Sequence, residues 1–169
     1  PAGKHSPSFG SAQCIDCVAG KYSTAGVTVC PACDAGFYSA SAASMCLQCP
    51  KGKYASTSGS AECTSCKSGK YSESAASVCI VCSAGKSAAV GSSACKTCPT
   101  GRYSAAVESG VCTACDSGYF QNIMGSTACD KCPAGQVTTT TGLSACTMCA
   151  VGKYSTSGTA CTDCAAGRY

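Results

Sequence analysis

The sequence has few of the side chains that normally build a hydrophobic core. Its 169 residues include no Trp, three Phe, three Ile, two Leu and ten Val. Leu, Ile, Val and Phe together make up about a ninth of the chain, below the roughly 20% that marks chains able to form a core. Since ordering each residue costs about 1–2 kcal/mol of backbone entropy, apolar burial alone is not expected to hold this chain folded.

Long apolar runs, strong charge and catalytic side chains are scarce as well. No stretch reaches the roughly 18 consecutive apolar residues of a transmembrane helix. The net charge of +4 is mild for this length and does not indicate a nucleic-acid partner. The only His is His5, and the eight acidic residues are scattered without a calcium-loop pattern. We therefore predict no membrane span, no nucleic-acid binding, no cofactor and no enzymatic activity.

Cysteine is abundant instead. The 20 Cys make up nearly 12% of the chain, above the roughly 8–10% typical of a disulfide scaffold. Disulfides persist in oxidising compartments, which predicts an extracellular or cell-surface location. The cysteines form ten C-x-x-C pairs whose first members recur every 15 to 17 residues. The sequence thus predicts one continuous array of about ten cysteine-rich repeats over residues 1–169, with both ends of the sequence inside a repeat.

Two further positions keep their place in the repeat. A Gly stands three residues after the second Cys of every pair, which predicts a positive φ or a close approach of another segment. The residue two positions after this Gly, here called the aromatic position, is usually Tyr. The glycines are Gly20, Gly36, Gly52, Gly69, Gly85, Gly101, Gly118, Gly135, Gly152 and Gly167, and the matching tyrosines are Tyr22, Tyr38, Tyr54, Tyr71, Tyr103, Tyr154 and Tyr169.

Several cysteine connectivities are compatible with this spacing. Each C-x-x-C could close on itself, successive pairs could interlace, or two pairs could hold a zinc ion. Joining the second Cys of one pair to the first of the next is favoured, because each loop then holds one Gly, one aromatic position and one Ser-rich return. This pairing uses Cys17–Cys30, Cys33–Cys46, Cys49–Cys63, Cys66–Cys79, Cys82–Cys95, Cys98–Cys112, Cys115–Cys129, Cys132–Cys146 and Cys149–Cys161, and it leaves Cys14 and Cys164 unpaired.

The motif C-x-x-G-x-Y-S, followed by small or polar residues and then C-x-x-C, resembles the ephrin-receptor-like cysteine-rich repeat. It is also similar to the one-disulfide module that opens the cysteine-rich domains of tumour-necrosis-factor receptors. The resemblance covers the whole chain, unit by unit. It implies a rod of small disulfide-closed β loops or hairpins with little hydrophobic core, bridges of the Cys17–Cys30 type and no catalytic residues. Repeats of this kind occur in receptor ectodomains and in long surface proteins of protists and algae.

The stretches between the aromatic position and the next Cys are rich in Ser and Thr, which suits O-glycosylation. The candidate hydroxyls are Thr138, Thr139, Thr140, Thr141, Ser155, Thr156 and Ser157. The residue after the repeat Gly is basic in most units, which is typical of a solvated face or of a cationic ladder that faces acidic polysaccharide. These cations are Lys4, Lys21, Lys53, Lys70, Lys86, Arg102, Lys153 and Arg168.

The monotony of the repeats favours a structural function. A shaft segment of an extracellular filament or surface coat, associating with copies of the same chain, needs no unit that differs from the others. The alternative is the stalk or ligand-binding ectodomain of a cell-surface receptor. In that case specificity is expected in an irregular unit such as YFQNIMGSTAC at 119–129.

Overall fold

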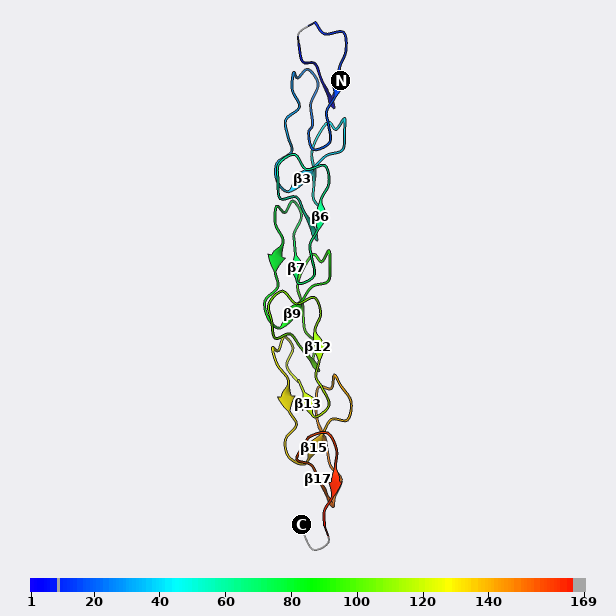
Figure 1. Cartoon of the computed structure of the whole chain (residues 1–169), viewed down its shortest axis with the longest axis vertical. Coiled ribbons are helices and arrows are strands. Elements are labelled where there is room, and N and C mark those ends of the chain that lie inside the picture. The colour runs from blue at the N-terminus through cyan, green and yellow to red at the C-terminus, as the bar shows by residue number, and fades with distance from the viewer. Residues whose placement is uncertain (9, 166–169) are drawn as a thin grey trace. The chain divides into compact units, whose positions relative to one another are not determined.

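The computed structural model describes residues 1–8 and 10–165, which form a series of short antiparallel hairpins (Figure 1). In each hairpin the two residues after the repeat Gly pair with the two residues inside the next C-x-x-C. The strands pair as β1 (Lys4–His5) with β2 (Ile15–Asp16), β3 (Phe37–Tyr38) with β4 (Leu47–Gln48), β5 (Lys53–Tyr54) with β6 (Thr64–Ser65), β7 (Lys70–Tyr71) with β8 (Ile80–Val81), β9 (Lys86–Ser87) with β10 (Lys96–Thr97), β11 (Arg102–Tyr103) with β12 (Thr113–Ala114), β13 (Tyr119–Phe120) with β14 (Asp130–Lys131), β15 (Gln136–Val137) with β16 (Thr147–Met148), and β17 (Lys153–Tyr154) with β18 (Thr162–Asp163).

Each hairpin is preceded by a tight turn that explains the repeat Gly. In the β5–β6 hairpin the amide of Lys53 donates to the carbonyl of Pro50 at 3.0 Å, which closes a four-residue turn. Gly52 occupies the third position of that turn with φ +80°. A type II turn requires a positive φ at this position, which Gly adopts without steric cost. The predicted need for positive φ is therefore confirmed.

Nine disulfides close the loops. They join Cys17–Cys30, Cys33–Cys46, Cys49–Cys63, Cys66–Cys79, Cys82–Cys95, Cys98–Cys112, Cys115–Cys129, Cys132–Cys146 and Cys149–Cys161, with sequence separations of 12 to 14. This is the connectivity that the loop regularity favoured. Cys14 and Cys164 are free thiols. The repeat positions Gly167, Arg168 and Tyr169 lie outside the described residues.

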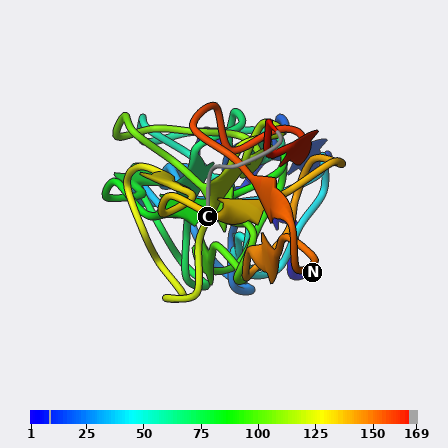
Figure 2. The same ribbon diagram turned by 90° about the horizontal axis from the view of Figure 1, so that it is seen from below.

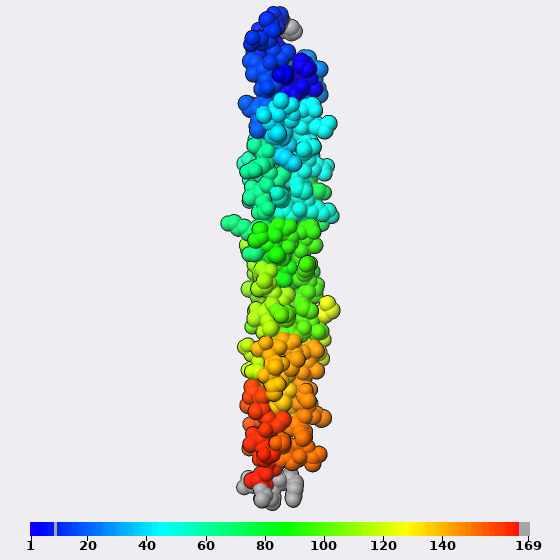
Figure 3. Space-filling view, turned by 90° about the vertical axis from the view of Figure 1, so that its right-hand side faces the viewer, coloured from blue at the N-terminus to red at the C-terminus, as the bar shows by residue number. Residues whose placement is uncertain are grey.

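The chain divides into two compact units. The first comprises residues 1–81 and 89–94, and the second comprises 82–88 and the residues from 95 onward. Within each unit the repeats follow one another in chain order, as the colour zones of Figure 3 show. In the end view, the later hairpins of the second unit, drawn in yellow to red, point in different directions (Figure 2).

The interior consists of cysteine and small residues. The second Cys of each pair is buried from Cys17 to Cys132, and Val137 is the largest aliphatic side chain among the buried hydrophobic residues that the structure describes. Two-stranded hairpins of this length are not stable alone in water, so each depends on its bridge and its neighbours. The predicted fold class, small disulfide-rich repeats of β loops with little hydrophobic core, is confirmed. The described part of the chain contains no helix that could span a membrane.

Candidate functional site at the repeat junctions

Backbone contacts link each repeat to the next two. The amide of Gly52 donates to the carbonyl of Ser72 at 2.9 Å, one repeat onward. The amide of Gly91, at the tip of the loop after that, donates to the carbonyl of Cys66 at 2.9 Å. A Cβ on Gly52 would overlap the carbonyl oxygen of Gly91, so the close approach predicted for the repeat Gly is also present. Equivalent contacts recur in both units and form the core of each junction.

The residue that follows the aromatic position is buried in the described repeats after the first, where Ser6 is half-buried. It is Ser23, Ser39, Ala55, Ser72, Ala88, Ser104, Gln121, Thr138 or Ser155, each at most 4% exposed. Where the residue is Ser or Thr, its hydroxyl often donates to a strand carbonyl of the preceding repeat. Examples are Ser39 Oγ to the Lys21 carbonyl and Ser72 Oγ to the Lys53 carbonyl, both at 2.9 Å. Sequence reasoning included this Ser in the motif but missed its role as a buried link between repeats.

We expect Ser72→Ala to weaken this junction by about 1 kcal/mol, the usual contribution of one hydrogen bond. The loss should stay small because Ala55 and Ala88 occupy the same position in other repeats without a hydroxyl. Native-state hydrogen exchange at the Gly52 amide measures the change, since this amide donates to the Ser72 carbonyl. Ser74→Ala, on the exposed part of the same loop, is the matched control. An equal effect of both substitutions would contradict the assigned role.

At several repeats the residue at the aromatic position lies beside the disulfide of the following repeat. Tyr22 and Cys46 line one surface hollow of about 280 Å³, together with Asp34 and Phe37. Two repeats further on, Tyr54 and Cys79 line another hollow of about 240 Å³. The Tyr rings are half-buried at these positions. These two rings therefore lie close to the bridge of the following repeat at the protein surface.

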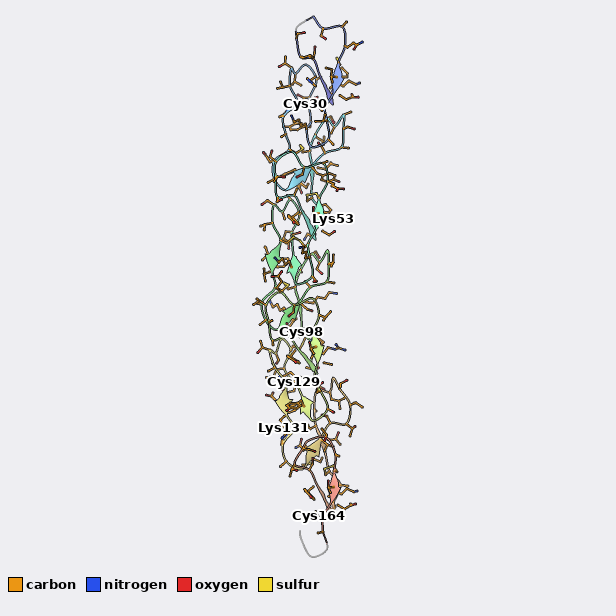
Figure 4. The ribbon with its side chains drawn as sticks, viewed as in Figure 1. Cys30, Lys53, Cys98, Cys129, Lys131 and Cys164 are labelled. Atoms are coloured by element: carbon orange, nitrogen blue, oxygen red, sulfur yellow. A yellow bond between two sulfur atoms is a disulfide. The ribbon has the colours of Figure 1, made fainter. Side chains whose placement is uncertain are left out.

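The cations after the repeat Gly differ in their surroundings. In the first and last described hairpins they form cross-strand ion pairs, Lys4 with Asp16 and Lys153 with Asp163, both at 2.9 Å. The hydrogen bond and charge of Asp16 raise the pKa of the Lys4 ammonium above its ordinary value. By contrast, Lys53 faces the neutral Ser65 across the hairpin and its side chain is exposed (Figure 4). The exposed cations are available to partners at little desolvation cost.

The candidate glycosylation hydroxyls fall into two groups. Thr139, Thr140, Thr141, Thr156 and Ser157 are exposed. Thr138 is 1% exposed and its Oγ1 accepts from the Gly118 amide at 2.7 Å, while Ser155 is 3% exposed and accepts from the Gly158 amide at 3.2 Å. A buried, hydrogen-bonded hydroxyl is not accessible to a sugar transferase. The structure therefore limits the candidates to the five exposed hydroxyls.

Comparison with known proteins identifies the repeats. Residues 36–80 and 101–149, more than half of the chain, match the family described as tyrosine-protein kinase ephrin type A/B receptor-like. The chain belongs to this ephrin-receptor-like family. The first matched segment contains the full C-x-x-G-x-Y-S pattern at 66–72, the second keeps its C-x-x-G part at 115–118 and 132–135, and the segments fall one in each unit. No curated protein matches the chain.

The family and the nine disulfides indicate the same location for the protein. Ephrin-receptor-like cysteine-rich repeats are an extracellular type of domain, and tandem disulfides of this density persist where the environment is oxidising. Both observations indicate an extracellular or cell-surface protein. The role of the junction residues is structural, because they hold the backbone of one repeat against the backbone of the next two.

Proposed function

We propose that the chain is a non-catalytic shaft segment of an extracellular filament or surface coat. The observation that carries this proposal is the repetition of one junction along each unit. The same Gly–tip contact occurs at Gly20 with Gly59, at Gly36 with Ala75 and, in the second unit, at Gly101 with Gly142. An array in which every repeat makes the same contacts with the next two repeats can be extended without a new kind of contact. Copies of the same chain are its proposed partners in the filament.

Electron microscopy of the native particle tests the proposal. We expect long filaments that contain the chain, with the C-x-x-G-x-Y-S peptides recovered from them by mass spectrometry. Short discrete ectodomains with a globular protein bound at one place would contradict the filament function. They would instead support the receptor alternative.

We further propose that the filament is O-glycosylated on the exposed hydroxyls of its Ser-rich returns. The returns at 139–141 and 156–157 carry several hydroxyls on small exposed side chains. Sugars there would add polar surface to a part of the chain that also exposes apolar residues such as Met148 and Val151. An increase in solubility and in resistance to proteases is the expected benefit.

Peptide mapping of the native protein with electron-based fragmentation measures the sites of glycosylation. We expect hexose or pentose additions on Thr139, Thr140 or Thr141 and on Thr156 or Ser157. Thr138 and Ser155 are internal controls, because they lie in the same peptides but are buried. Unmodified native peptides would contradict glycosylation, and sugar on Thr138 would contradict the accessibility argument.

Acidic polysaccharide is a second proposed partner. Three exposed cations follow the repeat Gly of their units, namely Lys21, Lys53 and Lys86. Lys53 and Lys86 lie in β-strands, and Lys21 lies in an isolated β-bridge. Recurrent cations suit a polymer whose negative charges also recur. Binding should then fall steeply with salt, because exposed charge contacts are screened within about 8 Å at physiological ionic strength.

One feature favours the receptor alternative. The Cys115–Cys129 loop exposes Tyr119, Ile123 and Met124, with 41%, 64% and 62% of their surfaces accessible. Aromatic and Met side chains are enriched in the centres of protein interfaces. As a ligand-binding ectodomain, the chain would therefore bind its partner at this loop. Binding at one such place is the outcome that separates the two functions.

A further inference from the structure

One disulfide has an imidazole against it. His5 occupies the aromatic position of the first hairpin, and its Nδ1 lies 3.2 Å from Sγ of Cys30. The nearest ring nitrogen and the sulfurs of Cys17 and Cys30 all lie within 4.8 Å of one another. Such a group of atoms would suit a metal ion if both sulfurs were thiolates, but here they form a disulfide. The arrangement is therefore an imidazole beside an S–S bond.

The bridge is reachable from solvent on one side. Cys17 is 1% exposed, whereas Cys30 is half-buried and lines an open hollow of about 280 Å³. His5, Lys21 and Asp16 line the same hollow, with Ile15 and Val29 as apolar walls, and the Asp16 carboxylate is paired with Lys4 at 2.9 Å. The volume accommodates a small thiol, and the Lys21 ammonium attracts the negatively charged thiolate form. A nucleophile that enters the hollow reaches Cys30 rather than the buried Cys17.

Other repeats place a different group at this position. Tyr22 shares a hollow with Cys46, and Tyr54 shares one with Cys79. At a further junction Oγ of Ser87 lies 3.3 Å from Sγ of Cys112. Phenol and hydroxyl groups keep their protons near neutral pH, whereas imidazole exchanges its proton there. His5 is the only His of the chain, so it sets the Cys17–Cys30 bridge apart from the other eight.

We propose that Cys17–Cys30 is a thiol–disulfide exchange site whose co-substrate is a dithiol and whose proton donor is His5. A thiolate of the dithiol attacks Sγ of Cys30 and forms a mixed disulfide, and the S–S bond to Cys17 breaks. The Cys17 sulfur leaves with the electron pair and takes the proton of the His5 imidazolium. The second thiol of the reagent then attacks the mixed disulfide, which releases oxidised reagent and the Cys30 thiol. The dithiol is oxidised and the bridge is reduced.

Partial reduction followed by alkylation and peptide mapping tests this site, with dithiothreitol as the dithiol. All variants carry Cys14→Ser, so that the free thiol three residues from Cys17 does not take part. Cys17–Cys30 should open faster than the other bridges by about tenfold or more, a conservative figure for a positioned acid–base group. His5→Tyr, which installs the residue found in most repeats, should remove this difference.

Tyr22→His is the gain-of-function control. It places an imidazole beside Cys46, in a hollow one repeat onward, and should accelerate opening of Cys33–Cys46 by a similar factor. Equal opening rates for all nine bridges in the Cys14→Ser protein would overturn the proposal. A fast Cys17–Cys30 bridge that persists in His5→Tyr would also overturn it, since place in the chain rather than the imidazole would then be the cause. An unchanged Cys33–Cys46 rate in Tyr22→His would count against the imidazole in the same way.

Discussion

Reduction of all nine disulfides is expected to unfold the chain completely in native buffer. Among the residues that the structure describes, the buried hydrophobic ones are cysteines, two alanines and Val137, which provide too little apolar area to offset chain entropy. Each bridge closes a loop with a sequence separation of 12 to 14, and loops of this size contribute about 3 kcal/mol each in the chain-entropy account. Hydrogen exchange in a phosphine reductant measures the result. Amides such as Gly52 and Cys66 should exchange at the rate of an unfolded chain.

Removal of one bridge provides the matched control. The double variant Cys49→Ser with Cys63→Ser should lose protection in its own loop and in the neighbouring loops that contact it, while distant repeats keep theirs. This locality follows because, in the described part of the chain, the backbone of each repeat bonds to no repeat beyond the two before it and the two after it. Slow exchange in the fully reduced chain would contradict the covalent account of stability. Loss of protection along a whole unit in the double variant would contradict the locality.

The features that could be predicted from sequence are those fixed within one repeat. The bridge pattern follows from loop regularity, and the φ of Gly52 follows from its place in a tight turn. The Tyr position could be read as a half-buried surface because it forms a strand directly after that turn. In each case residues close by in the sequence determine the local geometry. Because the motif recurs in every repeat, the same local pattern can be recognised many times.

Features that depend on contacts between repeats are only partly predictable, since the motif indicates a close approach at the repeat Gly but not the buried link at Ser72. Ser72 is buried and its hydroxyl donates to the Lys53 carbonyl of the preceding repeat, and a motif letter does not indicate that contact. Thr138 and Thr139 belong to one uniform run of four Thr, yet the first is buried and the second is exposed. The sequence does carry a sign of this burial, because the residue after the aromatic position is always small or polar. Whether this position is buried depends on how the preceding and following repeats are placed against it, which the motif does not give.

Gly52→Ala is expected to have the largest effect of any single substitution at the junctions. An L-residue at φ +80° costs about 1–2 kcal/mol. The added Cβ would also overlap the carbonyl oxygen of Gly91. Because this neighbour is backbone held by the bond from the Gly91 amide to the Cys66 carbonyl, the segment must shift, at a cost of roughly 1–3 kcal/mol by analogy with overpacked cores. The total of about 3 kcal/mol should appear as roughly 100-fold faster exchange at the amides of Gly52 and Gly91.

Gly91→Ala separates the two contributions. Gly91 also has a positive φ, +72°, but a Cβ there meets no atom within 4 Å. Other repeats already carry a side chain at this tip, since Ala42, Ala75 and Glu108 have φ of 57°, 58° and 61°. We therefore expect Gly91→Ala to cost only about 1 kcal/mol, the backbone term alone. If both substitutions accelerated exchange equally, the close approach would contribute nothing, and the repeat Gly would be required for its turn alone. A clear excess for Gly52→Ala would show that this position is restricted to Gly by the contact between a repeat and the second one after it.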